Sequence, residues 1–300
     1  MINSKIIKKL SPCFFFLVLF ALFSLVVTAR SEANKSCLWA IKTDRNSVYL
    51  LGSLHLMKKE AYPLSRAIEN AYDNSEIIVF ETDLDAMNEP AFQLKMMSAG
   101  MYPDGNTLSK NLPEKTYLLL KERLKELNLP VEKFDSFKPW FCATVISIAE
   151  LKKRGFDPAF GIDNYFFSKA KQDSKKRFFF ETGEFQINLF TAMEELNQAL
   201  FLEQTLKDIE IIETMFPEIV KCWENGDAKN LALIINKSLM EYPAIYERFI
   251  IKRNNNWLSI IESFFRQDKN VLIIVGTGHL VGGEGIVELL KNKGYTLKQH

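Results

Sequence analysis

Short apolar runs typical of β-strands stand at both ends of this chain, and a long block with helical spacing separates them. The first two runs flank a turn-like segment, residues 43–46, and predict a hairpin. Two strands alone cannot bury their faces, so the strands at the two ends have to pair with each other. The sequence therefore predicts an α/β fold of the mixed α+β type: one domain with a mixed central sheet formed from N- and C-terminal strands, and a large helical insertion. The predicted strands are residues 39–41, 47–52, 77–80, 177–180, 271–275 and 295–298.

The remaining segments favour helices. Ala199, Leu202 and Leu206, for example, recur at steps of three and four residues. We expect the longest helical block to break near Pro217, at residues 225–226 and near Pro243, because proline and glycine interrupt helices. The predicted helices are residues 64–72, 91–97, 113–128, 140–153, one after Asp163, several between 184 and 266, and 286–292.

Two of the three histidines occupy the same local setting. Leu51-Gly52-Ser53-Leu54-His55 follows one predicted strand, and Val275-Gly276-Thr277-Gly278-His279 follows another. A glycine there lets the chain leave the sheet in a conformation that other residues resist, and aims the histidine across the carboxyl end of the strand, where α/β sheets bind ligands. A single such histidine is more often structural, but if the two strands are neighbours their imidazoles meet at one site. The third histidine, His300, is the terminal residue and is expected to fray.

Two glutamates repeat the pattern. Phe80-Glu81-Thr82 and Phe180-Glu181-Thr182 each end a predicted buried strand. A carboxylate there has to reach solvent, a hydrogen-bonded partner or a cation, and either glutamate alone would fit a helix cap or a loop salt bridge. Together with the two histidines they form the set that a divalent metal site or an acid/base site needs. Residue types alone do not say which metal such a set selects.

Arg253 and Asn254 lie in a predicted helix, with Arg248 and Trp257 nearby. Taken by itself, Arg253 is expected to be one more solvated charge on a long helix. The chain has no Gly-x-Ser-x-Gly elbow, no His-Glu-x-x-His pair and no Walker loop. The glycines that follow Gly276 lack the lysine and the spacing of a phosphate-binding loop.

The N-terminus predicts a signal peptide, residues 1–29, followed by a mature domain, residues 30–300. Lys5, Lys8 and Lys9 precede an apolar run over residues 13–27, and small residues follow at the expected cleavage site after Ala29. The run is shorter than the roughly 20 residues that span a bilayer as a helix. We therefore expect an exported protein, periplasmic or secreted, with no integral membrane domain after processing; an uncleaved segment would instead anchor the same domain to the membrane.

Three cysteines follow the apolar run, namely Cys37, Cys142 and Cys222. In an oxidising compartment they permit one intramolecular disulfide at most, and their spacing does not say which. Buried unpaired cysteines acting as small apolar side chains fit equally well.

The composition is that of a globular chain, since 47% of the residues are apolar and 25% are charged. The 38 basic and 37 acidic side chains nearly cancel, so the chain lacks the basic excess typical of nucleic-acid binders and no nucleic acid is expected as a partner. The oligomeric state stays open.

These motifs resemble the TraB/GumN family, also called TraB/PrgY, over nearly the whole mature chain. The similarity rests on the paired Gly-Ser-Leu-His and Gly-Thr-Gly-His and on the segment that follows them, residues 280–295. Residues 38–39, 80–82, 161–163, 181–182 and 253–254 resemble family positions in the same order. Serine at position 53, where threonine is common, is a mild departure.

The family includes the Tiki proteins, membrane-associated metal-dependent proteases that use two Gly-x-x-His motifs and a glutamate. The resemblance implies that His55, Glu81 and His279 bind a divalent metal cation such as Mn, Co or Zn, and that Arg253 and Asn254 support the site. With Glu81 or Glu181 as the base, these residues predict a metal-dependent hydrolase, most simply a peptidase. The alternative is a non-catalytic exported protein that binds and sequesters a peptide or small ligand in the same cleft.

Overall fold

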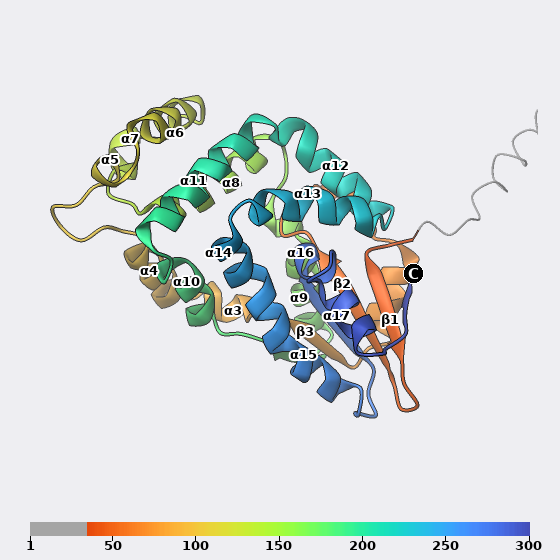
Figure 1. The fold of residues 1–300 in the computed structure, drawn as a ribbon. Helices are drawn as coiled ribbons and strands as arrows, with labels where there is room; N and C mark the ends of the chain where they lie inside the picture. The colour runs from red at the N-terminus through yellow and green to blue at the C-terminus, as the bar shows by residue number, and fades with distance from the viewer. Residues whose placement is uncertain (1–34) are drawn as a thin grey trace, which may run out of the picture. The chain divides into compact units, whose positions relative to one another are not determined.

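The strands from the two ends of the chain share one six-stranded sheet, which confirms the predicted fold class (Figure 1). The structure is a computed structural model that describes residues 35–300, apart from the side chains of residues 237–239. The strand order is β4-β3-β5-β2-β1-β6, so the late strand β5 lies between two early ones. Strands β2, β3, β4 and β5 run parallel, whereas β1 is antiparallel to both β2 and β6. The bounds are β1 (Leu38–Lys42), β2 (Ser47–Ser53), β3 (Ile77–Phe80), β4 (Lys176–Phe179), β5 (Val271–Gly276) and β6 (Leu297–Gln299).

The other regular elements of the described chain are helices, and most of the predicted ones form within a few residues of their expected bounds. The first group, up to β4, is η2 (Lys59–Ala61), α2 (Arg66–Asp73), α3 (Leu84–Met87), α4 (Pro90–Ala99), α5 (Leu108–Asn111), α6 (Glu114–Glu126), α7 (Val131–Phe134), α8 (Pro139–Lys153), η3 (Pro158–Phe160) and α9 (Ile162–Gln172). The second group is α10 (Gly183–Thr191), α11 (Glu195–Glu210), α12 (Ile212–Glu224), α13 (Ala228–Met240), α14 (Pro243–Tyr246), the π-helical turn η4 (Glu247–Ile251), α15 (Lys252–Phe264), α16 (Thr277–Leu280) and α17 (Ile286–Asn292).

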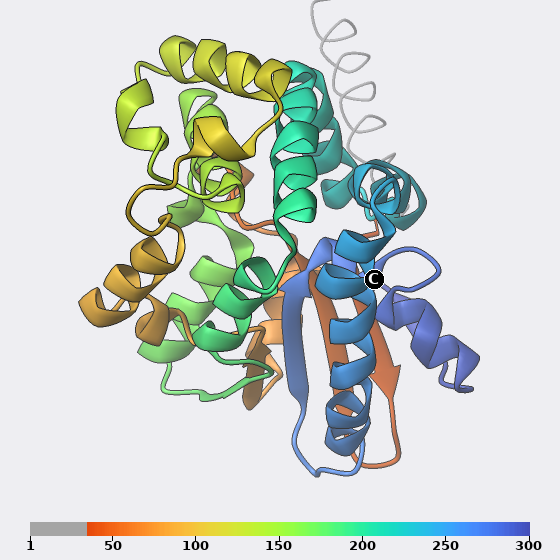
Figure 2. The ribbon, with the colours of Figure 1, turned by 60° about the vertical axis from the view of Figure 1, so that its left-hand side comes forward.

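Helices cover both faces of the sheet. Successive side chains of a strand point to opposite faces, and in β4 Phe178 contacts Phe264 of α15 while Phe179 contacts Phe167 of α9. Helices α9 and α15 therefore lie on opposite faces; α15 is seen in front of the strands in Figure 2. Both faces of β3 and β5 are buried, which explains their continuous apolar sequences.

The helical insertion has a hydrophobic core of its own. Leu120 of α6, Ile146 of α8 and Leu202 of α11 are fully buried in it, separately from the core that surrounds the sheet. Helices α5, α6 and α7 lie away from the sheet in both views (Figures 1 and 2). The insertion can therefore be stable without lying flat on the sheet.

Several local predictions were wrong. Strand β4 is a half-exposed edge strand rather than a buried one, with Phe178 40% exposed. Pro217 lies inside α12 and does not end it. The backbone N–H that it lacks would bond to Glu213 near the start of that helix, so a single hydrogen bond is lost while Ile219 and Trp223 stay buried against the sheet core. His300 is not frayed, because its backbone N–H donates to the carbonyl of Leu38 at 2.9 Å.

The cysteines of the described residues, Cys37, Cys142 and Cys222, are free and buried, as the interpretation of them as small apolar side chains predicts. The predicted signal peptide, residues 1–29, lies outside the described part of the chain. Among the helices of residues 35–300 there is none whose length and apolar character would let it cross a membrane.

Candidate active site

The predicted site residues follow the carboxyl ends of neighbouring parallel strands. His55 comes two residues after β2 and His279 three residues after β5, and these strands pair directly, with Ser53 opposite Gly276. Glu81 follows β3 and Glu181 follows the adjacent β4. The prediction that the two Gly-x-x-His strands are neighbours is therefore confirmed.

The glycines of these motifs are needed for space rather than for an unusual backbone conformation, contrary to the sequence-based expectation. Neither Gly52 nor Gly276 has a positive φ. A Cβ on Gly52 would stand 2.8 Å from Thr277 Oγ1. A Cβ on Gly276 would stand 3.2 Å from Glu81 Oε1 and 3.6 Å from both His55 Nε2 and His279 Cδ2. Gly276 is thus the point at which the three predicted metal ligands converge.

Arg253 is the centre of a buried hydrogen-bond network that joins the acids to His279. Its Nη2 donates to Glu81 Oε2 at 2.6 Å and to Glu181 Oε2 at 2.8 Å, and its Nε donates to Glu181 Oε1 at 2.9 Å. Its Nη1 lies 2.9 Å from His279 Nε2. Arg253 is only 6% exposed, so the expectation of a solvated surface charge is wrong.

Asn254 fixes the orientation and the tautomer of His279. Its Oδ1 lies 2.7 Å from His279 Nδ1, and its Nδ2 donates to the backbone carbonyls of His279 and Glu284. The amide oxygen can only accept a hydrogen bond, so Nδ1 of His279 carries the proton. Nε2 is then unprotonated, and its lone pair faces Arg253. Burial, together with the nearby Arg253 and His55, lowers the pKa of His279 to about 3, so this imidazole is neutral.

Glu81 is held in its ionised form. Its Oε1 accepts the backbone N–H of Gly276 at 2.6 Å, while its Oε2 accepts from Arg253. Burial disfavours the charge, but the attraction of Arg253 and the hydrogen bond from Gly276 outweigh it and keep the pKa of Glu81 well below its ordinary value of 4.5. In this arrangement Glu81 is a weak base.

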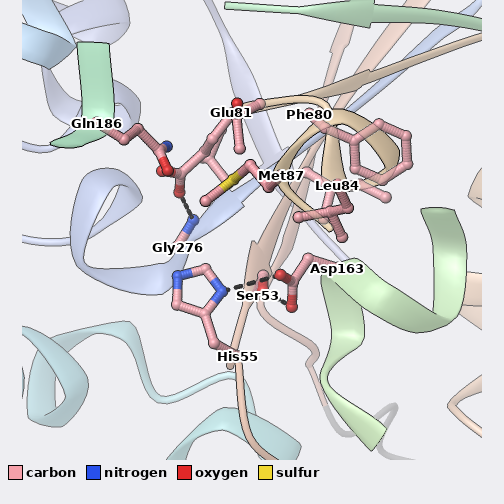
Figure 3. A pocket seen from close by; sticks show the side chains of 12 residues that line it. Ser53, His55, Phe80, Glu81, Leu84, Met87, Asp163, Gln186 and Gly276 are labelled. Carbon is pink, nitrogen blue, oxygen red and sulfur yellow. Dashed lines mark hydrogen bonds and ion pairs between the residues drawn. The ribbon is translucent and has the colours of Figure 1, made fainter. Parts of the chain in front are cut away.

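His55 belongs to a separate pair. Its Nδ1 lies 3.1 Å from Asp163 Oδ2, and Ser53 Oγ donates to Asp163 Oδ1 at 3.1 Å. The other edge of the ring, with Nε2, lies on the side of Gly276 and Glu81 (Figure 3). The charge of Asp163 raises the pKa of His55 above its ordinary value of 6.5. The His55 side chain is 58% exposed, so water screens part of that attraction.

A cavity of about 220 Å³ opens beside these residues (Figure 3). His55, Glu81 and Asp163 contribute its charged wall, and Phe80, Leu84 and Met87 are among its apolar lining. Thr82 also lines it; this residue is 5% exposed, and its hydroxyl has no hydrogen-bond partner among the described residues. The complete lining is Ser53, His55, Phe80, Glu81, Thr82, Leu84, Met87, Asp163, Gln186, Ile274, Val275 and Gly276.

As they stand, the side chains do not fit a divalent metal ion. Arg253 already takes the only lone pair of His279 Nε2 and one of the two lone pairs of Glu81 Oε2, which places its positive charge where the ion would stand. Within residues 35–300 no group of three or more His, Cys, Asp or Glu side chains is placed to hold a metal ion. The metal-ligand role of His55, Glu81 and His279 stays a prediction.

The sequence reasoning did not select Asp163, Ser53 or Trp257. Asp163 is the second residue of α9, more than a hundred positions after its partner His55, and the sequence marked it only within residues 161–163, which resemble family positions. A Cβ on Gly161 would clash with the backbone of His55, so this glycine lets α9 approach His55 closely. Trp257 lies one helical turn after Arg253, packs its ring against the guanidinium and donates Nε1–H to Glu181 at 3.0 Å. Its place on the same helix face as Arg253 was a usable signal.

Comparison with known proteins agrees with the motifs. Residues 37–299 match the TraB/PrgY/gumN family, and the chain belongs to that family. It is 21% identical to the uncharacterized protein YbaP of Escherichia coli (strain K12), over 81% of this chain and 87% of that protein. It is 24% identical to metalloprotease TIKI1 of Xenopus tropicalis, over 89% of this chain, and 24% identical to that of Homo sapiens, over 90%. The chain spans 61% and 62% of these two TIKI1 proteins. No solved structure matches the chain.

Proposed function

We propose that this protein is a hydrolase that cleaves peptide bonds in the cavity at the carboxyl edge of the sheet. The observation that carries the proposal is the placement of His55, paired with Asp163, opposite the carboxylate of Glu81 across Gly276. Because metalloproteases are among its relatives, a peptide is the substrate we favour for this protein. The apolar lining of the cavity suits the side chain of a peptide.

His55 is the proposed general base. A proton on Nδ1 is held by Asp163, which leaves the Nε2 lone pair directed towards Glu81 and Gly276. A water molecule hydrogen-bonded to Nε2 can give up its proton there as it attacks a carbonyl carbon. The raised pKa makes the neutral imidazole a stronger base but requires a higher pH to populate it.

Glu81 and Thr82 are proposed to orient the reactants. Each carboxylate oxygen of Glu81 can accept a further hydrogen bond besides those from Gly276 and Arg253, so Glu81 can hold the second hydrogen of the water. The hydroxyl of Thr82 is buried beside the cavity without a partner, and a rotation of this side chain would let it donate to the substrate carbonyl oxygen, on which negative charge develops. As the C–N bond breaks, the imidazolium of His55 returns its proton to the leaving nitrogen; an amine and a carboxylic acid are released, and the acid then gives its proton to solvent.

Glu181, one of the two bases predicted from the sequence, is proposed here as a positioning residue of the catalytic site. The same role is proposed for Arg253 and Asn254, which the family resemblance predicted to support that site. Glu181 and Arg253 hold Glu81 in place, and Asn254 orients His279. The divalent cation that the family relationship suggests enters no step of this mechanism, because the side chains as placed do not fit it.

The proposal includes export. Residues 1–29 are proposed to act as a signal peptide and residues 30–300 to form the mature domain, working in the periplasm or outside the cell. N-terminal sequencing of protein from fractionated cells tests this: cleaved protein begins at Arg30, whereas recovery of Met1 in washed membranes would contradict cleavage.

The catalytic proposal is tested by incubating the purified protein with a diverse peptide library and identifying products by mass spectrometry. We expect products that disappear in His55→Ala and Glu81→Gln, with Thr82→Val reducing the rate at unchanged folding. Stoichiometric capture of intact peptides, with no products in any variant, would identify a binding protein instead.

A further inference from the structure

An arginine already occupies the atoms that a metal ion would need. Arg253 contacts Glu81 Oε2 at 2.6 Å, Glu181 Oε2 at 2.8 Å and His279 Nε2 at 2.9 Å. We propose that the guanidinium of Arg253 is the resident cation of this site, and that the protein functions without a bound divalent metal ion.

The geometry does not allow the guanidinium of Arg253 and a divalent metal ion to bind these atoms at the same time. A divalent ion binds imidazole nitrogen and carboxylate oxygen at about 2.0–2.2 Å. An ion bound to His279 Nε2 would need the single lone pair that now accepts Nη1–H, and an ion bridging it to Glu81 Oε2 would press against the guanidinium. Because the two cations also repel each other, a metal ion can bind these atoms only after Arg253 has left.

Arg253 is held too firmly to act as a movable cover. The Glu181 carboxylate forms a bidentate ion pair with it, accepting from Nε at 2.9 Å and from Nη2 at 2.8 Å. The carbonyl of Phe249 accepts from Nη1 at 3.3 Å. The ring of Trp257 lies 4.8 Å from the guanidinium carbon. With 6% exposure the side chain has no free route into solvent, so it is part of the fixed structure of the site.

The contacts also explain why a guanidinium suits this place. Its planar donors reach a carboxylate on one side, a second carboxylate on another and a neutral imidazole on the third. A lysine ammonium carries the same charge but cannot make this set of directed bonds. Arg253 therefore balances part of the charge of Glu81 and Glu181 and fixes His279, two functions that a metal would otherwise provide.

The experiment measures metal binding directly. Full-length protein is expressed and purified without chelator, its metal content is measured by elemental analysis, and Mn²⁺, Co²⁺ and Zn²⁺ are then titrated into it by calorimetry. We expect no stoichiometric metal in the wild type and no saturable binding at one ion per chain. Arg253→Met frees the lone pairs of Glu81, Glu181 and His279 and is expected to gain binding of one ion, which Arg253→Met/His279→Ala loses.

Arg248→Met is the matched control. It removes the same charge from the preceding turn, where the Arg248 side chain bonds to the carbonyl of Ala192 outside the network, and it is expected to leave metal binding as in the wild type. If Arg253→Met does not fold, the titration of the wild type still decides. One tightly bound ion per wild-type chain that is lost in His279→Ala would overturn the proposal, and so would a folded Arg253→Met that gains no metal.

A cleavage assay in the presence of chelators rests on the proposed function, whereas the metal-binding measurements do not. Peptide cleavage that is insensitive to EDTA and 1,10-phenanthroline supports both. Cleavage that stops with chelator and returns with metal overturns the resident-cation proposal and the metal-free mechanism, but leaves the assignment as a peptide hydrolase. A wild type that binds no metal and yields no products contradicts the proposed hydrolase and leaves the role of Arg253 intact.

Discussion

Replacing Arg253 by methionine is expected to destabilise the protein strongly and in a pH-dependent way. Methionine fills a similar volume, but it leaves the carboxylates of Glu81 and Glu181 without the cation they share. The side chains of these two glutamates are 13% and 5% exposed, so water can replace little of the lost interaction. Removing one partner from a buried ion pair costs about 3–5 kcal/mol. For a domain of this size that corresponds to a fall in Tm of roughly 6–20 °C.

The pH dependence follows from the carboxylate of Glu81. In the wild type its pKa is held below the ordinary value of 4.5, so its contribution to stability is present above about pH 4.5 and is lost as the pH falls through the lowered pKa. Without Arg253 the ionised form is buried with the Gly276 N–H as its remaining hydrogen-bond donor, which makes the penalty largest at neutral pH. Below pH 4.5 Glu81 can take up a proton in the variant, so the gap between wild type and variant narrows.

The assay is urea denaturation followed by circular dichroism at pH 7 and pH 4. Arg248→Met is the control, because the Arg248 side chain bonds to the carbonyl of Ala192 outside the network, and it is expected to change stability by less than about 0.5 kcal/mol. A loss below about 1 kcal/mol at pH 7, or a loss of equal size at both pH values, would refute the reasoning that Arg253 neutralises buried charge.

Two further predictions concern activity. Asp163→Asn removes the charge that raises the pKa of His55. The acidic limb of the pH–rate profile, where His55 becomes protonated, is therefore expected to move down by about one pH unit. A limb that does not move would show that His55 is not the base. Gly276→Ala places a Cβ 3.2 Å from Glu81 Oε1 and is expected to lower kcat about 10²-fold in a peptide assay, whereas Gly283→Ala, with nothing within 4 Å, is expected to be silent; equal rates in the two variants would contradict the close approach at Gly276.

The sheet could be predicted from the sequence because its closure depends on patterns that are visible along the chain. Buried parallel strands read as continuous apolar runs, and the need to pair them brings the two ends of the chain together. The sequence of β4 did not show that it is a half-exposed edge strand. Residues such as Arg177 and Phe178 fit both an edge strand and a central strand, so the strand order is needed to tell the two apart. Pro217 was misjudged because the packing of α12 against the core outweighs one lost hydrogen bond.

The site was predictable only as far as strand ends determine it. His55, Glu81, Glu181 and His279 follow strands and were brought together by topology alone. Arg253 reaches them from a helix, and whether a helical arginine faces solvent or a buried acid depends on how the helix is rotated against the sheet. The pairing of Asp163 with His55 depends in the same way on where α9 begins.

The central position of β5 determines the order in which this protein can be assembled. Strands β2 and β3 each pair with β5 rather than with each other, so the ribosome has made most of the chain before the middle of the sheet exists. Contacts so distant in sequence form slowly, whereas the insertion, with its own core, can fold earlier. A nascent chain that lacks β5 carries His55 after β2 and Glu81 after β3, but the strand that pairs with both and holds the two residues together is still missing. A chain of this topology can therefore acquire its site only as the final event of folding.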